Sequence, residues 1–397
     1  MKQQKLFALL LSLLLVFALI APAAAADSSD SSIKNVIFMI GDGMGENHLL
    51  LAKEQGYDLF MDKAPDLRGQ SMTRSFSDEV TDSAAGATAL SCGVRNINRG
   101  LCTYWFDPLG LFVQPRIITE AAMAHGMKTG IVTTDKTSGA TPAGYSSHCV
   151  DRGLAGQISF EQMRSGIDLI WGANEDEATE KDALRNGLQY ITTKEEMDAL
   201  TPGSRSFGQF SGNTWWEYPP ENDPSPTLQQ MGEKAIELLN ADNENGFFLM
   251  IEGAHIDKNS HRTEEGVDFP KKISDTAWAV KSFDNMIKAA VDFAKEDGHT
   301  LVVITADHET GDLYLDNGRY TFHSGSHTGK NVPLLVYGAD DLFAQGEAVE
   351  NRSIPGRIAE KLGWCKAAFP ALNAGKVPQA FWYIISLKPL RDLIFKK

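Results

Sequence analysis

The first indication of the fold is the stretch at residues 35–43, Asn-Val-Ile-Phe-Met-Ile-Gly-Asp-Gly. A continuous apolar run of strand length that ends in a glycine-rich turn is typical of a buried strand. Apolar runs of the same kind recur at residues 128–134, 247–251, 301–305 and 333–337. The sequence therefore predicts a sheet that is covered on both faces.

Helical patterns separate these runs. Residues 115–125 begin with a proline and stop before a glycine, residues 226–239 follow Ser225 as a cap, and residues 274–295 form a long amphipathic stretch. Alternation of strand and helix predicts the α/β class, as a three-layer αβα sandwich with a mostly parallel central sheet and loop insertions.

The chain shows no internal repeat, and its length fits one large domain with insertions. We expect this domain at residues 35–366, with an insertion at about 153–226. Residues 367–397 match neither a clean strand nor a capped helix, so they are predicted to form a C-terminal tail whose role the sequence does not define.

The N-terminus has the pattern of a secretory signal. Two lysines precede an uncharged apolar stretch at residues 6–20, and a run of small residues ends at Ala26. Residues 1–26 are thus predicted to be a cleaved signal peptide, with residues 27–34 as a polar leader. A retained membrane anchor is the alternative, although the apolar stretch is at the short limit for a span. We expect an exported protein, periplasmic or extracellular, without a stable membrane span after cleavage.

Charge and cysteine content narrow the function classes. The net charge of −15 becomes −17 when the two lysines of the signal are removed, and such an acidic surface argues against nucleic acid as a dedicated partner. Four cysteines are too few and too scattered to be the main source of stability. Pairing of Cys92 with Cys102 after export stays open.

Three acidic residues, Asp42, Glu252 and Asp307, follow the apolar runs closely. In open α/β sheets, functional groups collect beyond the carboxyl ends of the strands, where the loops converge. A carboxylate there is costly to bury unless a cation or a metal pairs with it. A turn or a helix cap explains one such residue, but three at equivalent strand ends favour a metal site.

Histidines near these acids strengthen the metal hypothesis. Asp257 and His261 are four residues apart, which places both on one face of a helix, and residues 307–308 are an adjacent Asp-His pair. His327, in a glycine-rich stretch, would complete a set of nitrogen ligands. Zinc accepts mixed His and Asp ligation, whereas calcium prefers oxygen alone. Each histidine taken singly is more often a surface or core residue, but together they favour ligands.

Residues 81–88, Thr-Asp-Ser-Ala-Ala-Gly-Ala-Thr, contain a candidate nucleophile. Ser83 precedes small, helix-compatible residues that reach Gly93, so it is predicted at a helix N-terminus, where amides and the dipole favour an anion. An ordinary helix cap is at least as common an explanation. The absence of a Ser-His-Asp hydrolase elbow and the number of metal ligands favour the nucleophile, because a zinc ion on the serine oxygen would lower its pKa.

These residues resemble the alkaline phosphatase family. Any one motif is weak evidence, but the ordered set is specific, and the resemblance runs from about residue 35 to residue 364. It rests on Gly41-Asp42-Gly43-Met44-Gly45, the serine segment 81–88, residues 252–261 (Glu-Gly-Ala-His-Ile-Asp-Lys-Asn-Ser-His), residues 305–309 (Thr-Ala-Asp-His-Glu), and His327 in a His-Thr-Gly context.

The resemblance implies two zinc ions and one magnesium ion as cofactors. Each ligand is carried over only where a motif of this sequence matches. The implied sets are Asp257, His261 and His327 for the first zinc; Asp42, Asp307, His308 and Ser83 for the second; and Asp42, Glu252 and Thr141 for magnesium.

The resemblance also implies two phosphate-binding side chains. Arg152 matches an arginine whose guanidinium grips two nonbridging phosphate oxygens, and Lys258 matches a lysine that reaches phosphate through water. Gly139 stands where the family carries Asp or His. The sequence therefore predicts a magnesium site that lacks one side chain, and a Lys258 without its usual acidic neighbour.

The implied activity is hydrolysis of small phosphate monoesters through a phosphoserine at Ser83, by a homodimer with a catalytic domain at residues 35–366. A phosphodiesterase of the same superfamily is the alternative, although Arg152 would crowd its second ester group. A secreted metal- or phosphate-binding protein without turnover is a third hypothesis, which a serine at a helix start disfavours. A sulfatase is disfavoured because Ala-Ala-Gly follows Ser83 in place of the x-Pro-x-Arg context of that nucleophile.

Overall fold

A computed structural model describes residues 33–63, 65–106, 111–175, 177–211, 225–262, 269–364 and 383–385 of the 397-residue chain. The predicted signal peptide, the leader up to residue 32 and all of the predicted tail except Tyr383–Ile385 lie outside the described residues. Those assignments therefore stay predictions. None of the helices among the described residues is both long enough and apolar enough to cross a membrane.

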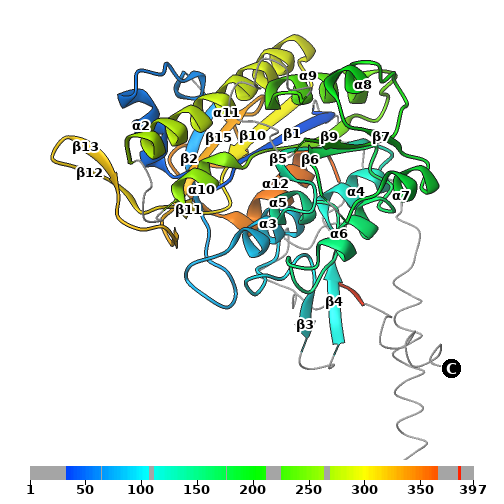
Figure 1. The fold of residues 1–397 in the computed structure, drawn as a ribbon, viewed down its shortest axis with the longest axis horizontal. Coiled ribbons are helices and arrows are strands. Elements are labelled where there is room, and N and C mark those ends of the chain that lie inside the picture. Colours follow the sequence, from blue (N-terminus) through cyan, green and yellow to red (C-terminus); the bar gives the residue numbers. More distant parts are fainter. Residues whose placement is uncertain are drawn as a thin grey trace, which may run out of the picture.

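The described chain is built on one ten-stranded sheet, of order β16-β2-β15-β10-β1-β9-β5-β6-β8-β7 (Figure 1). The five apolar runs of the sequence form five adjacent strands near its centre, so their prediction as strands is confirmed. Only β15 runs antiparallel to its neighbours within this sheet. The central strands are β15 (Val332–Tyr337), β10 (Thr300–Thr305), β1 (Asn35–Gly41), β9 (Phe247–Gly253) and β5 (Lys128–Lys136).

The outer strands carry weaker apolar patterns and were not predicted. Three of them, with three short helices, come from residues 153–226, where we expected an insertion, and they extend the sheet beyond β5. The outer strands are β16 (Ala348–Glu350), β2 (Leu67–Met72), β6 (Leu169–Ala173), β8 (Ser206–Phe210) and β7 (Gln189–Ile191), and the helices are α6 (Ala155–Gln162), α7 (Glu180–Arg185) and α8 (Lys194–Asp198).

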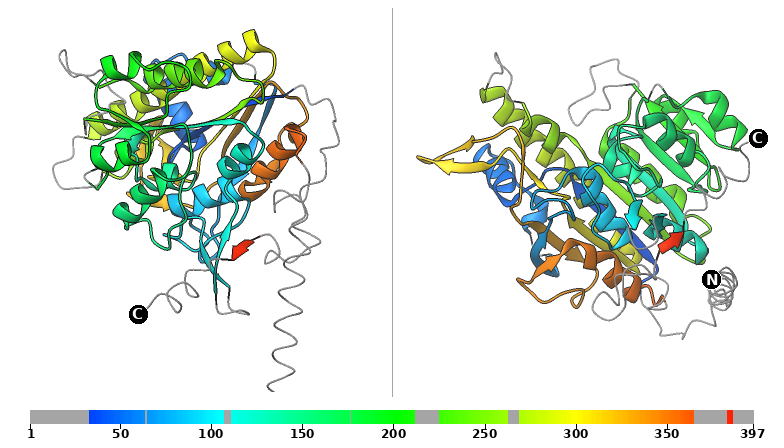
Figure 2. Two further views of the ribbon diagram at one scale, coloured as in Figure 1. Left: turned by 90° about the vertical axis from the view of Figure 1, so that its right-hand side faces the viewer. Right: turned by 90° about the horizontal axis from the view of Figure 1, so that it is seen from below.

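Helices cover both faces of the sheet, so the predicted three-layer sandwich is confirmed (Figures 1 and 2). Each face packs against a separate buried apolar cluster. One face carries α2 (Glu46–Glu54), α9 (Leu228–Asn240) and α11 (Phe269–Asp297), and the other carries α3 (Ser83–Cys92), α4 (Ile118–Ala124) and α12 (Ile354–Lys361). The loops at the carboxyl ends of the strands therefore lie on a scaffold with a core on each side.

Helix boundaries differ from the predicted ones for local reasons. Pro115 ends strand β4 (Leu111–Pro115), so α4 starts three residues later. Helix α9 is capped by Thr227 instead of Ser225, because the Thr227 hydroxyl accepts from the Gln230 amide while the Gln230 side chain accepts from the Thr227 amide. This reciprocal capping box overrides the proline as a start signal.

Small elements complete the described chain. A hairpin of β12 and β13 projects from the body (Figure 1), and β11 pairs with β14 below it. Cys92 and Cys102 are buried, reduced thiols. The remaining elements are β3 (Tyr104–Phe106), β11 (Glu309–Thr310), β12 (Leu313–Asp316), β13 (Arg319–Phe322), β14 (His327–Thr328), β17 (Tyr383–Ile385), α5 (Ala140–Ala143), α10 (His255–Ser260), η1 (Phe60–Asp62) and η2 (Asn351–Ser353).

Candidate active site at the carboxyl edge of the sheet

The strand register brings the acidic residues of the central strands to one level. Ile40 of β1 pairs with Thr305 of β10 and with Glu252 of β9. Asp42 and Asp307 each lie two residues beyond that paired row, so they leave the sheet side by side at its carboxyl edge. All three carboxylates are buried. The structure thus brings together the acids that the sequence placed at separate strand ends.

His308 lies between two of these acids and Ser83. Its Nε2 is 3.2 Å from Asp307 Oδ2, 3.4 Å from Asp42 Oδ1 and 3.1 Å from Ser83 Oγ. The Nδ1 on the other side of the ring is 3.1 Å from the hydroxyl of Thr310, which itself donates to Asp257. Because that hydroxyl already donates its only proton in the hydrogen bond to Asp257, Nδ1 must be the donor in this pair. The neutral ring therefore presents an unprotonated Nε2 to the site.

The two other histidines follow the same rule. His261 Nδ1 faces the Gly325 carbonyl at 2.6 Å, and His327 Nδ1 faces the Thr81 carbonyl at 3.0 Å. Carbonyl oxygens only accept, so both Nδ1 atoms carry protons. The two Nε2 atoms are nevertheless 3.0 Å apart. Two lone pairs at that distance repel each other unless a proton or a cation lies between them.

Asp257 lies beside both of these rings. Its Oδ1 is 3.1 Å from His261 Nε2 and 3.6 Å from His327 Nε2, and the rings of His327 and His308 stack at 3.5 Å. Potential ligand atoms therefore gather within 4.8 Å of one another in two sets that share His308, one with Asp42 and Asp307 and the other with Asp257 and His327. Mixed nitrogen and carboxylate donors fit zinc chemistry.

Burying these carboxylates so close together costs folding free energy unless cations balance their charge. Burial, and then the charges of Asp307, Asp257 and Glu252, raise the pKa of Asp42 well above its usual range. Burial and the charge of Asp257 raise the pKa of Asp307 to about 6, while burial lowers the pKa of His308 to about 4. Asp42 Oδ1 and Asp307 Oδ2 are buried without a hydrogen-bond partner. Metal ions would satisfy these oxygens and reverse the pKa shifts.

Glu252 and Thr141 form the oxygen-rich side of the site. Burial, and then the charge of Asp135, raise the pKa of Glu252 to about 8. Its Oε2 accepts a hydrogen bond from Thr133, whereas its Oε1 is buried without a partner. The hydroxyl of Thr141, on helix α5, is likewise buried and unpaired. Oxygen donors alone suit a hard cation such as magnesium.

Ser83 is the first residue of helix α3, as predicted. Asp82 caps this helix by accepting from the Ala85 amide at 3.0 Å, so Ser83 stays at the positive end of the dipole. Close approach to the acids depends on Gly86, because a Cβ there would lie 3.0 Å from the Asp307 backbone oxygen. Helix α3 is fully buried and made of small residues, which lets it pack this tightly.

Arg152 reaches the same helix start. Its Nη1 is 3.2 Å from Asp82 Oδ2, and its backbone amide donates to the Arg99 carbonyl. Because Asp82 directly precedes Ser83, this contact places the guanidinium beside the candidate nucleophile. A partly exposed arginine held by one carboxylate oxygen keeps donors for an incoming anion.

Lys258 has an acidic partner that sequence reasoning missed. Its ammonium group forms an ion pair with Asp135, at the end of β5. The expectation of a Lys258 without an acidic neighbour is therefore wrong. Asp135 follows an apolar run as closely as Asp42 does, so the same strand-end rule could have found it. Thr310 and Thr133 were also missed, since threonine carries no comparable signal.

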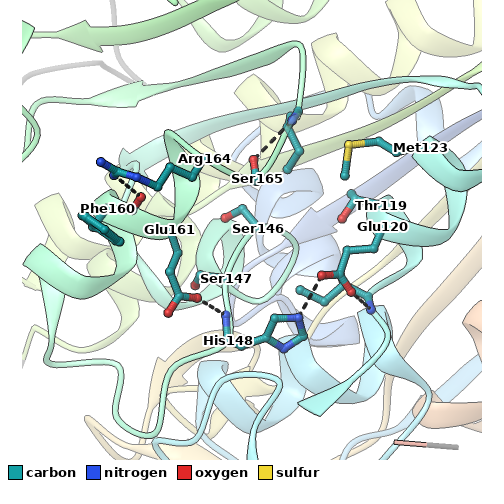
Figure 3. A pocket seen from close by; sticks show the side chains of 12 residues that line it. Thr119, Glu120, Met123, Ser146, Ser147, His148, Phe160, Glu161, Arg164 and Ser165 are labelled. Carbon is teal, nitrogen blue, oxygen red and sulfur yellow. Dashed lines mark hydrogen bonds and ion pairs between the residues drawn. The ribbon is translucent and has the colours of Figure 1, made fainter. Parts of the chain in front are cut away.

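A separate cavity is lined by residues of helices α4 and α6 and of the loop that contains His148 (Figure 3). Its volume is about 240 Å³. On one wall the His148 ring bonds Glu120 at 3.0 Å and the Cys102 carbonyl at 2.7 Å, and its backbone amide donates to Glu161. None of the predicted site residues lines this cavity. We assign the His148 contacts a structural role, in fastening the loop that leads to Arg152.

The fold and the site together define the class of protein. Acids and imidazoles at the carboxyl edge of a parallel sheet, with a buried serine at a helix start, are the arrangement of an α/β hydrolytic enzyme built around metal ligands. A family model described as Alkaline phosphatase matches residues 33–170 and 167–338. The chain belongs to the alkaline phosphatase family.

Individual relatives agree with this assignment. Alkaline phosphatase 4 of Bacillus subtilis (strain 168) is 32% identical, over 76% of this chain and 67% of its own length. Alkaline phosphatase of Escherichia coli (strain K12) is 30% identical, over 80% and 83%. The chain spans about two thirds of the length of two B. subtilis relatives. Among solved structures, alkaline phosphatase from the Antarctic bacterium TAB5 has a TM-score of 0.70 at 28% identity, over 84% of this chain and 99% of that one.

The His148 contacts predict a stability change at alkaline pH. Burial alone would lower the pKa of His148, but the hydrogen bond to Glu120 and the charge of that carboxylate raise it to about 9. A raised histidine pKa stabilises the fold fully below the unfolded pKa of about 6.5, and this stabilisation is lost as the pH rises through 9. We expect a loss of up to about 3 kcal/mol over that range.

The measurement is urea unfolding of wild type and His148→Gln between pH 6 and 10. The variant should be less stable at pH 6 and should show a flatter pH dependence. His323→Gln, which removes an exposed histidine on the β12–β13 hairpin, should follow wild type. Parallel curves for wild type and His148→Gln would contradict the assignment.

Proposed function

We propose that this chain is an exported phosphomonoesterase that hydrolyses phosphate monoesters to an alcohol and inorganic phosphate through a phosphoserine at Ser83. The observation that carries the proposal is the cluster of imidazole nitrogens and buried carboxylates in which His308 Nε2 lies 3.1 Å from the Ser83 hydroxyl. Relatives named alkaline phosphatase at about 30% identity support the same activity.

The donor sets fit two zinc ions and one magnesium ion. Nitrogen and carboxylate donors surround the zinc positions, whereas oxygen donors alone form the magnesium position. A variant of the TAB5 enzyme is described with Mg bound in its M3 site, which supports a magnesium ion in this family. The residues that would hold these ions are Asp257, His261 and His327 for one zinc, Asp42, Asp307, His308 and Ser83 for the other, and Asp42, Glu252 and Thr141 for magnesium.

Bound zinc would lower the pKa of the serine hydroxyl and of water, and would stabilise charge on the attacking and leaving oxygens. Arg152 would bind two nonbridging oxygens of the phosphate group, in line with the start of helix α3. Ser83 Oγ loses its proton and attacks phosphorus, so that the Oγ–P bond forms and the ester P–O bond breaks. The alcohol leaves with a proton.

The second half of the reaction frees the enzyme. Water attacks phosphorus from the face that the alcohol has left, its oxygen bonds to phosphorus, and the bond to Ser83 Oγ breaks. Ser83 regains a proton and inorganic phosphate dissociates. Throughout, Thr310 and the Thr81 and Gly325 carbonyls keep the imidazole Nε2 atoms pointed at the site.

The phosphodiesterase alternative requires space for a second ester group. Arg152 lies where that group would sit if it grips two phosphate oxygens, so the monoester assignment is favoured. Export and homodimer formation remain predictions. Secretion assays of the full chain and light scattering of the purified protein test them.

Chelation tests the proposed metal dependence. Hydrolysis of a chromogenic phosphate monoester should stop after treatment with a chelator and return when zinc is added, with a further gain from magnesium. The physical reason is that without a cation nothing lowers the pKa of the Ser83 hydroxyl or balances the negative charge of Asp42 and Asp307. A zinc-replete protein that cleaves a diester but no monoester would move the assignment to the phosphodiesterases.

Replacement of the nucleophile tests the phosphoserine. Ser83→Ala should lower kcat at least about 1000-fold, because loss of a nucleophile removes the covalent route altogether. Ser91→Ala is the matched control, since Ser91 is buried in the same helix. Rapid acid quenching and mass spectrometry should find phosphate on Ser83 in wild type. Wild-type turnover by Ser83→Ala would refute the mechanism.

A further inference from the structure

Position 139 is a glycine, and the side chain of another residue occupies the space beside its Cα. A Cβ built on Gly139 would lie 2.3 Å from Asp135 Oδ2 and 2.8 Å from Asp135 Cγ. A side chain at position 139 would require the Asp135 carboxylate to move away. The Asp135 side chain therefore fills the volume into which a residue at position 139 would project, and glycine is the residue that leaves this volume open.

The register places Asp135 among the acids of the site. Thr133 of β5 pairs with Glu252 of β9, which in turn pairs with Ile40 of β1. Asp135 lies two residues beyond this row, as Asp42 does on β1. The Thr133 hydroxyl accepts from the Asp135 amide at 2.8 Å and donates to Glu252, so one threonine orients both acids.

The contacts of Asp135 point toward the oxygen-rich side of the site. Its Oδ1 forms the ion pair with Lys258. Its Oδ2 faces Gly139, the residue that precedes helix α5 and stands two positions before Thr141. The two carboxylate oxygens of Asp135 therefore face Lys258 on one side and the Thr141 segment on the other.

Glu252 and Thr141 give separate evidence that a cation binds on this side of the site. Both carry buried oxygens without a hydrogen-bond partner, Oε1 and Oγ1 respectively. Both side chains are almost fully buried, at 0% and 1% exposure. These oxygens require a cation or an ordered water, and Asp135 is the further carboxylate beside them, joined to Glu252 through the Thr133 hydroxyl.

We propose that Asp135 supplies, from strand β5, the carboxylate that Gly139 cannot, and that it acts as a positioning residue for the water shell of the magnesium ion and for Lys258. This inference rests on the proposed function, because it assumes the magnesium position at Glu252 and Thr141. It reverses the expectation of an impaired magnesium site, because a carboxylate four positions earlier in the chain occupies the space that a side chain at position 139 would fill.

The exchange of the two positions tests this proposal. Zinc-loaded wild type is compared with Asp135→Ala, Asp135→Asn and the double variant Asp135→Ala/Gly139→Asp. The primary measurement is magnesium binding by equilibrium dialysis with metal analysis, and the second is phosphate binding by calorimetry. Loss of an outer-shell carboxylate typically costs 10–100-fold in metal affinity.

We expect Asp135→Ala to raise the magnesium Kd at least about 10-fold at unchanged zinc content, and to weaken phosphate binding through a loosened Lys258. Asp135→Asn, which keeps the shape of the side chain, should show the same loss. It serves as the test if Asp135→Ala folds poorly. The double variant should recover to within about threefold of wild type, as a purely structural role would not predict.

Asp198→Asn is the matched control, because it breaks an Asp–Lys ion pair on helix α8, which lies away from helices α3 and α10 of the site (Figure 1). Its magnesium Kd should equal that of wild type. An unchanged Kd in both Asp135 variants, or a loss that Gly139→Asp does not restore, would overturn the proposal. Zinc-dependent monoester turnover by wild type is measured first, so failure of the proposed function is seen separately.

Discussion

Parallel strands in register force their carboxyl ends to one edge, and in this protein each of four adjacent strands brings an acid there. Asp42, Asp307, Glu252 and Asp135 converge on a space that is largely closed to water. Like charges in such a place raise one another's pKa values and weaken the fold unless cations balance them. The remaining contacts of the site leave space for such cations next to the Ser83 hydroxyl.

Hydrogen bonds and close packing around the cluster orient its side chains. Hydrogen bonds from the Nδ1 side of three imidazoles leave the Nε2 atoms free to face inward. Gly86 lets helix α3 approach Asp307, so that Ser83 lies both at the positive helix end and within 3.1 Å of His308. Asp82 then caps the same helix and holds Arg152, which links the nucleophile to the group proposed to bind phosphate.

The sequence was informative where burial leaves a strong pattern. Five apolar runs predicted the central strands, and the acids and histidines after them could be selected because those residue types are rare at such positions. The outer strands β2 and β8 were missed because each contains glycine and glutamine, which break the apolar run. Lys258 was predicted to lack a partner because Asp135 acts from four residues before the expected position, and only the register shows where its side chain lies.

The claim that the acidic cluster exists to hold cations is tested most directly by anomalous diffraction at the zinc edge, on crystals of zinc-loaded protein. Two strong peaks are expected, one within about 2.0–2.2 Å of Asp257, His261 and His327, and the other at the same distances from Asp42, Asp307 and His308. Absence of both peaks, with the imidazole and carboxylate groups hydrogen-bonded directly to one another, would show that the cluster does not hold cations.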